Sequence, residues 1–173
     1  MEAVTGEEQS ADSELEQRLC PQRFHAALAP NIAARLEGTT VSDAQLAEGL
    51  CAWHGHADYV VVEGAGGLLS PVSDTMLGAD LAARLQLPIV LVAPNRLGVI
   101  HQTLAAVEAA AGRSLSVRAV ILNEATPESS DVLKKNNASE LRRLLPDIAL
   151  TVTKWNHATP FHAADILEWF HTG

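Results

Sequence analysis

The sequence of 173 residues is poor in cysteine, aromatic side chains and positive charge. Its two cysteines, Cys20 and Cys51, fit neither a metal site nor a disulfide framework, so a reduced cytoplasm is the expected location. Lys and Arg number 12 against 21 Asp and Glu, and the net charge of −9 argues against nucleic acid and anionic membranes as partners. No apolar run is long enough to span a bilayer.

A glycine-rich loop ending in Gly-Lys-Ser or Gly-Lys-Thr is also absent from these 173 residues. In many α/β proteins that loop surrounds nucleotide phosphates with backbone N–H groups. The chain starts instead with an acidic, polar stretch, residues 1–19, which we expect to be flexible. The composition of this stretch is the opposite of a signal peptide.

Hydrophobic residues make up 47% of the chain and charged residues 19%, which is typical of one soluble globular domain. Apolar runs that predict strands alternate with segments that predict helices. Strands are expected at 59–62 and 88–93, both buried, and at 117–122 and 148–152; helices are expected at 31–36, after an N-cap at Ser42, at 79–85, at 99–111, ending at 141–145, and at 163–170. This alternation predicts an α/β fold with a doubly wound parallel sheet.

Three loops with unusual sequences follow expected strands directly. Glu63–Gly67 follows the first strand, Asn95–Gly98 the second and Asn123–Glu124 the third. Ligands of open parallel sheets bind outside the carboxyl ends of the strands. We therefore expect the three loops to converge at one edge of the sheet and to form the functional site there.

The first loop places a carboxylate at a strand end and follows it with almost bare backbone, Gly64, Ala65, Gly66 and Gly67. Glu63 could cap the following turn by accepting backbone N–H bonds, and the glycines could supply positive φ angles. The succession of small residues after the carboxylate favours a functional interpretation. In it, Glu63 binds Mg²⁺, which prefers carboxylate oxygen, and the bare backbone lets a small substrate approach its N–H groups.

The other two loops have both structural and functional interpretations. Leu97 and Gly98 open a helix, whose free N–H groups and positive dipole end suit a carboxylate or phosphate, but such a loop is also ordinary in an α/β unit. Asn123 could be a turn residue, or its amide could donate to and accept from adenine.

Other polar groups carry weaker signals. His54 and His56 lie close together but at an expected helix end, and the tail histidines have no recognisable spacing: His157, His162 and His171. Four basic residues are expected on a solvated helix face: Lys134, Lys135, Arg142 and Arg143. No Ser or Cys has a nucleophile motif around it.

Four segments together resemble the dethiobiotin synthetase family. They are Phe24–Gly38, Glu63–Gly67 with Pro71 and Asp80, Leu97–Ile100 with Thr103 and Leu104, and Val120–Asn123. The occurrence of all four in this order is specific, although no single segment would be. The resemblance runs from about residue 21 to residue 123.

The resemblance implies an ATP-dependent ligase of biotin biosynthesis that carboxylates 7,8-diaminopelargonate with CO₂ or bicarbonate and closes the ring of dethiobiotin. It implies ATP and Mg²⁺ as cofactors and a homodimer. By the same resemblance Glu63 and Asp12 bind Mg²⁺, and Asn123 binds adenine. The substrate-binding residues implied are Thr5, Gly64, Ala65, Gly66, Gly67, Leu97, Gly98 and His101, the last standing where the family usually has Asn.

The family begins with a strand, a phosphate loop and a helix, whose motif is absent here. The expected fold is therefore a P-loop NTPase-like, three-layer α/β domain of residues 1–173, truncated at its N-terminus, without its first β–P-loop–α unit and without an identifiable catalytic lysine. Two alternatives stay open beside the ligase. One is an inactive relative that binds a small molecule or pairs with another subunit, and the other is a cobyrinate-type amide synthase domain.

Overall fold

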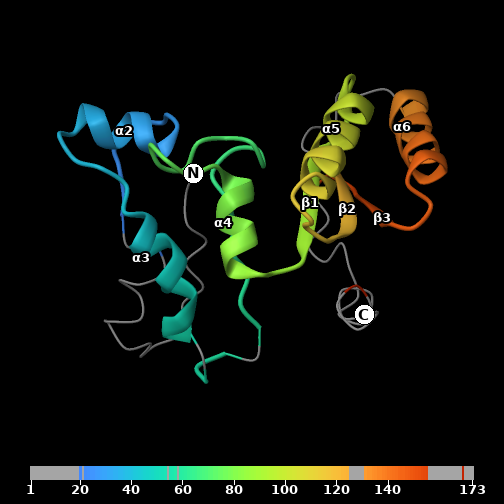
Figure 1. Ribbon diagram of the computed structural model, residues 1–173. Coiled ribbons are helices and arrows are strands. Elements are labelled where there is room, and N and C mark those ends of the chain that lie inside the picture. Colours follow the sequence, from blue (N-terminus) through green and yellow to red (C-terminus); the bar gives the residue numbers. More distant parts are fainter. Residues whose placement is uncertain are drawn as a thin grey trace. The chain divides into compact units, whose positions relative to one another are not determined.

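The computed structural model describes residues 20, 22–53, 55–57, 59–124, 131–155 and 169 (Figure 1). Contacts divide the chain into two compact units. The helical unit comprises Met1–Gly66 and Ser70–Leu81, and the sheet unit comprises Gly67–Leu69 and Ala82–Gly173. In the described parts of both units, no helix is long and apolar enough to cross a membrane.

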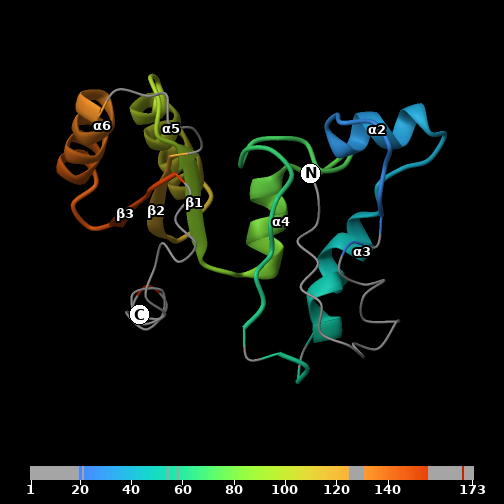
Figure 2. The ribbon, with the colours of Figure 1, turned by 180° about the vertical axis from the view of Figure 1, so that it is seen from behind.

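The sheet unit is built on three parallel strands in the order β1-β2-β3, namely Ile89–Pro94, Val117–Asn123 and Ala149–Thr153. Two helices connect them, α5 (Val99–Ala111) and α6 (Asp131–Leu144). Both helices pack on the face of the sheet that carries alternate residues of β2, as Figures 1 and 2 show. The buried core lies between these layers and consists of Val99, Val120, Leu122, Ala138 and Leu141.

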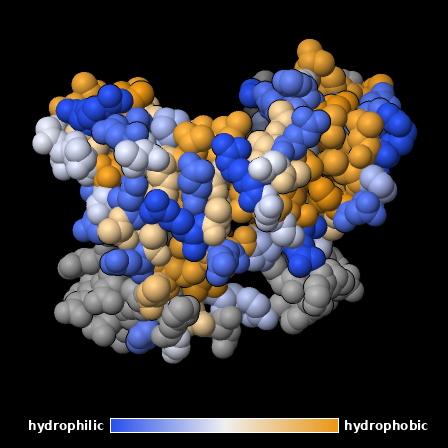
Figure 3. Space-filling view, in the orientation of Figure 1, coloured by the Kyte–Doolittle hydropathy of each residue, from blue (hydrophilic) through white to orange (hydrophobic). Residues whose placement is uncertain are grey.

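This arrangement confirms the α/β class and the parallel sheet predicted from the alternation of elements. The predicted helix at 99–111 matches α5, and the predicted strands at 88–93, 117–122 and 148–152 match β1, β2 and β3 within one residue at either end. The side chain of Val92 is 65% exposed, however, because α5 and α6 cover the opposite face of β1. Hydrophobic side chains accordingly reach the surface of the sheet unit (Figure 3).

The helical unit contains α2 (Pro30–Leu36), α3 (Asp43–Glu48) and the 3₁₀-helix η1 (Gly49–Trp53), and α4 (Gly78–Leu85) runs from it into the sheet unit. Pro30 begins α2, where a missing N–H costs no hydrogen bond. Ser42 caps α3 as predicted, since its hydroxyl oxygen accepts from the N–H of Gln45 at 3.3 Å.

The predicted buried strand at Tyr59–Val62 is wrong. These residues form no strand and are exposed, Val61 by 91% and Tyr59 by 66%. A run of four residues forms a strand only when a neighbour supplies partners for its backbone groups. Among the described residues, no strand pairs with this run.

Candidate functional site

Two of the three predicted loops lie at one edge of the sheet unit. β1 and β2 run parallel with Pro94 opposite Asn123, so Asn95–Gly98 and Asn123–Glu124 leave the sheet side by side. The N–H of Asn95 donates to the carbonyl oxygen of Asn123 at 2.8 Å and joins the two loops directly. The predicted convergence is therefore confirmed for this pair.

The Asn123 side chain is exposed at this edge but is held by the neighbouring strand. Asn123 lies opposite Thr153 in the register of β2 and β3. The Thr153 hydroxyl, which is nearly buried, donates to Asn123 Oδ1 at 2.7 Å. The N–H of Glu124 donates to the carbonyl oxygen of Thr153 at 3.0 Å. The amide therefore has a fixed partner on one side and faces solvent on the other.

A buried amide pair joins the loop after β1 to α6, and the sequence interpretation missed its α6 member, Asn137. Asn95 and Asn137 are 3% and 6% exposed. Asn137 Nδ2 donates to Asn95 Oδ1 at 3.0 Å and to the carbonyl oxygen of Arg96 at 3.2 Å. Asn95 Nδ2 donates in turn to the carbonyl oxygen of Lys134 at 3.4 Å. These bonds tie the loop after β1 to the middle of α6.

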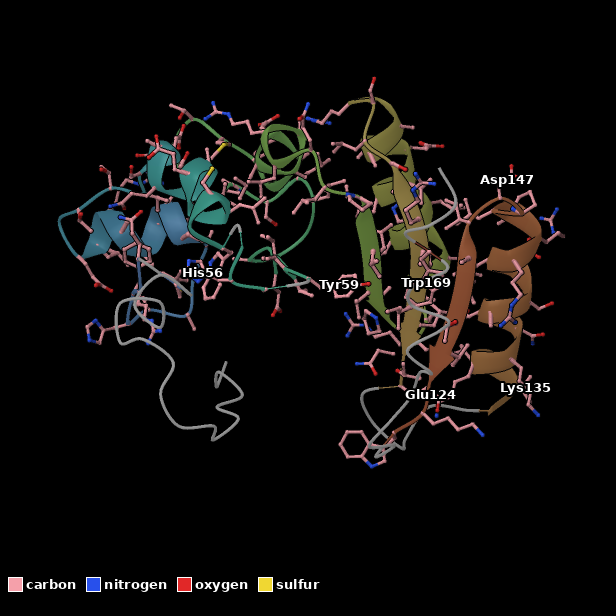
Figure 4. All side chains as sticks on the ribbon, turned by 90° about the horizontal axis from the view of Figure 1, so that it is seen from below. His56, Tyr59, Glu124, Lys135, Asp147 and Trp169 are labelled. Atoms are coloured by element: carbon pink, nitrogen blue, oxygen red, sulfur yellow. The ribbon has the colours of Figure 1, made fainter. Side chains whose placement is uncertain are left out.

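A buried ion pair completes the edge. Lys134 Nζ lies 3.2 Å from Glu124 Oε2, and the two side chains are 8% and 15% exposed. The prediction that Lys134 lies on a solvated helix face is wrong, because its side chain lies on the α6 face that meets the sheet edge. Lys135 is exposed and points away from the sheet, and Glu124 lies where β2 ends (Figure 4). We call the six residues Asn95, Asn123, Glu124, Lys134, Asn137 and Thr153 the polar edge.

The loop after β1 opens α5 as the sequence predicts. Gly98 is the N-cap with a φ of 92°, a left-handed conformation that favours glycine, and no side chain caps this helix. Leu97 is 83% exposed and His101 is exposed in the first turn, whereas Val99 is fully buried. The first turn of α5, whose backbone N–H groups have no partners within the helix, therefore adjoins an exposed loop.

The Glu63–Gly67 loop is accessible throughout. Glu63, Gly64, Ala65, Gly66 and Gly67 are all exposed. Gly66 has a φ of 80°, and a Cβ added there would lie 2.6 Å from Ser70 Oγ, so this position favours glycine. Glu63–Gly66 belongs to the helical unit, so its convergence with the polar edge stays a prediction.

Of the remaining residues that were considered for metal or substrate binding, several lie outside the part of the chain that the structure describes. Thr5 and Asp12 lie outside the described residues, as do His54, His157, His162 and His171. Asp80, part of the motif after Glu63, accepts from the N–H of Leu77 at 2.9 Å and thereby caps the start of α4. Within the described ranges, no group of three or more His, Cys, Asp or Glu side chains is placed to hold a metal ion. Mg²⁺ binding by Glu63 stays a prediction.

Comparison with known proteins identifies the family. A family model described as an AAA domain matches residues 3–153, most of the chain. The chain belongs to this family. Within it, the chain is 41% identical over 135 residues to an ATP-dependent dethiobiotin synthetase of Rhodopirellula baltica and 44% identical over 137 residues to one of Anaeromyxobacter dehalogenans. The resemblance to dethiobiotin synthetases is thus confirmed.

The matched regions are large in this chain but smaller in the relatives. They cover 72% of this chain and 52% of the Rhodopirellula protein, and 79% of this chain and 61% of the Anaeromyxobacter protein. A third relative, an ATP-dependent dethiobiotin synthetase of Phenylobacterium zucineum, is 42% identical over 117 residues, which are 50% of its length. The matched part of the chain therefore spans about half to three fifths of the length of these three relatives.

Proposed function

We propose that this chain supplies the nucleotide-base and substrate sites of an ATP-dependent dethiobiotin synthetase. The identity of 41% to 44% with proteins of that name carries the proposal. The reaction would convert 7,8-diaminopelargonate, CO₂ or bicarbonate, and ATP into dethiobiotin, ADP and phosphate. It would take place in the cytoplasm, in a homodimer.

The proposed chemistry has three steps. One amine of the substrate adds to CO₂ and loses a proton, giving a carbamate. A carbamate oxygen attacks the terminal phosphorus of ATP, and ADP leaves with the electrons of the broken P–O bond. The second amine then attacks the carbamate carbon, the ring closes, and phosphate departs as the amine loses its proton. Every step needs positioning and charge stabilisation more than a covalent bond to the protein.

The polar edge suits adenine binding in this scheme. The exposed amide of Asn123 can donate to one ring nitrogen and accept from an exocyclic amine, a donor and acceptor pair that adenine complements. Asn95 and Asn137 hold the adjoining loop in place through their mutual bond at 3.0 Å. That loop leads to Leu97, Gly98 and His101, where the substrate carboxylate would bind at the start of α5.

The exposed Glu63 carboxylate suits Mg²⁺, which takes hard oxygen ligands and would neutralise charge on the phosphates. Gly64, Ala65, Gly66 and Gly67 would line the substrate pocket with backbone. Thr5 would contact the substrate, and Asp12 would be a second metal ligand. These roles rest on the family resemblance.

A reconstituted enzyme tests the proposal. The strand, phosphate loop and helix with which the family begins are joined to the N-terminus of the chain, and dethiobiotin is measured by mass spectrometry together with released phosphate. We expect both products only with diaminopelargonate, bicarbonate, ATP and Mg²⁺ all present. The original 173 residues should give neither product, because they contain no phosphate-loop motif.

Two variants sharpen this test. Glu63→Gln should lower the rate of the reconstituted enzyme by at least about 100-fold, because a metal ligand is lost. Glu48→Gln makes the same charge change at an exposed site on α3 and should leave the rate unchanged. A folded reconstituted protein without dethiobiotin formation would contradict the proposal and favour the inactive relative. Phosphate release that does not depend on diaminopelargonate would also contradict it.

A further inference from the structure

We infer that Thr153 is a positioning residue that sets the base selectivity of Asn123. This inference rests on the proposed role of Asn123 in adenine binding. It comes from the hydrogen bond between the two side chains, in which the Thr153 hydroxyl donates to Asn123 Oδ1 at 2.7 Å. The sequence interpretation gave Thr153 no role.

The carboxamide of asparagine has an oxygen end and a nitrogen end with different hydrogen-bonding properties. One end accepts hydrogen bonds and the other donates two, so rotation of the amide by half a turn exchanges donors for acceptors. An exposed asparagine without a fixed partner can present either end to a ligand. In this chain, the Thr153 hydroxyl donates to Oδ1 at 2.7 Å. A turned amide would instead donate an Nδ2–H to this hydroxyl, and the observed orientation is favoured because an amide oxygen is a better acceptor than a hydroxyl oxygen.

The position of Thr153 is itself well fixed. Thr153 is 8% exposed and lies opposite Asn123 in the parallel register of β3 and β2. Its carbonyl oxygen accepts from the N–H of Glu124, so backbone bonds hold both strands at this point. A β-branched side chain in a strand has few χ1 choices, which limits movement of the hydroxyl further.

The selected orientation has a consequence for base recognition. It leaves the two Nδ2 donors and the second lone pair of Oδ1 for a ligand. Adenine offers the acceptor N1 beside its donor 6-amino group and matches this arrangement, whereas guanine offers the donor N1–H beside the acceptor O6, which is the reverse order. An amide held by Thr153 therefore rejects guanine, whereas an amide free to turn can present its donor and acceptor in the reverse order and match guanine.

The test uses nucleosides, which lack phosphates and so do not depend on a phosphate loop. Adenosine and guanosine are titrated into the 173-residue protein, and affinities are measured from backbone and side-chain amide shifts by NMR. Thr153→Val keeps the shape but removes the donor, and we expect it to lower the ratio of adenosine to guanosine affinity about fivefold, the value of one neutral hydrogen bond. Thr153→Ser keeps the donor and should retain most of the ratio.

The matched control is Thr151→Val, the same change two residues earlier on the same face of β3. Among the described residues, the hydroxyl of Thr151 has no hydrogen-bond partner, so its loss should leave the ratio unchanged. If Thr153→Val alters the ratio no more than Thr151→Val does, the inference is overturned while adenine binding stands. If the unchanged protein does not bind adenosine, the proposed base site fails, and the inference fails with it.

A second measurement keeps the inference testable should Thr153→Val not fold. In the unchanged protein, the Thr153 hydroxyl proton should exchange with water more slowly than the hydroxyl proton of Thr151, because it is engaged with Asn123 Oδ1. Equal exchange rates for the two hydroxyl protons would show that Thr153 does not hold the amide. That result would overturn the inference.

Discussion

Replacing Lys134 by methionine should destabilise the sheet unit strongly. Methionine retains most of the aliphatic stem and removes only the ammonium group. Glu124 then keeps its negative charge at a site where its side chain is 15% exposed and has lost the partner at 3.2 Å. A buried charge without its partner is costly because water cannot replace the lost interaction.

The size of this effect follows from the burial of both groups. Removal of one partner from a buried ion pair costs about 3 to 5 kcal/mol. Glu124 retains some contact with solvent, which places the expected loss for Lys134→Met near the lower limit, at about 3 kcal/mol. The double variant Lys134→Met/Glu124→Gln removes both charges, so its loss should be smaller, below about 1.5 kcal/mol.

Urea unfolding followed by far-ultraviolet circular dichroism measures these differences as shifts in the free energy of unfolding. Lys135→Met is the matched control, since Lys135 is adjacent in sequence but exposed, and its replacement should change the free energy by less than about 0.5 kcal/mol. Equal losses for Lys134→Met and Lys135→Met would refute the reasoning. So would a double variant that is less stable than Lys134→Met alone.

Three further predictions concern local features. Ser42→Ala should cost about 1 kcal/mol in urea unfolding because the N–H of Gln45 loses its acceptor, and Ser42→Asp should retain the cap. Gly98→Ala should cost about 1 kcal/mol through its φ of 92° alone, since a Cβ there meets no atom within 4 Å. In NMR titrations, the pKa of Glu37 should lie below its ordinary 4.5, chiefly because the His25 backbone N–H donates to its carboxylate. Its stabilising contribution is therefore present above pH 4.5 and is lost as the pH falls through the lowered value, and His25→Ala should preserve most of the shift.

The sequence was sufficient to predict those elements for which local sequence signals and burial agree. The run at 117–122 is apolar apart from Arg118 and contains three β-branched residues, and it forms the central strand, where both neighbouring strands bond to its backbone. The N-cap at Ser42 and the helix start at Gly98 depend on residues within one turn, so they too could be predicted. The convergence of the loops after β1 and β2 followed from parallel topology alone.

The sequence was insufficient to predict features that depend on residues far away along the chain. Tyr59–Val62 has the composition of a strand, but pairing requires a neighbour whose position no local pattern encodes. Lysine is usually a surface residue, and the burial of Lys134 depends on Glu124, ten residues earlier at the end of β2. Asn137 gave one usable signal, because asparagine is a poor residue for the middle of a helix unless its amide has a partner elsewhere.

The polar edge also bears on why base recognition and phosphoryl transfer should be separable in this chain. Transfer requires a cation close to the moving phosphoryl group, and each 1.4 kcal/mol of lost stabilisation slows the reaction about tenfold. Lys134 cannot take that role, since its ammonium already pairs with Glu124 and its side chain is 8% exposed. The role proposed for Asn123 needs no such charge, because its amide would recognise a neutral base, and its Oδ1 accepts a hydrogen bond from Thr153. The 173 residues are therefore expected to bind adenosine measurably while leaving the terminal phosphate of ATP intact.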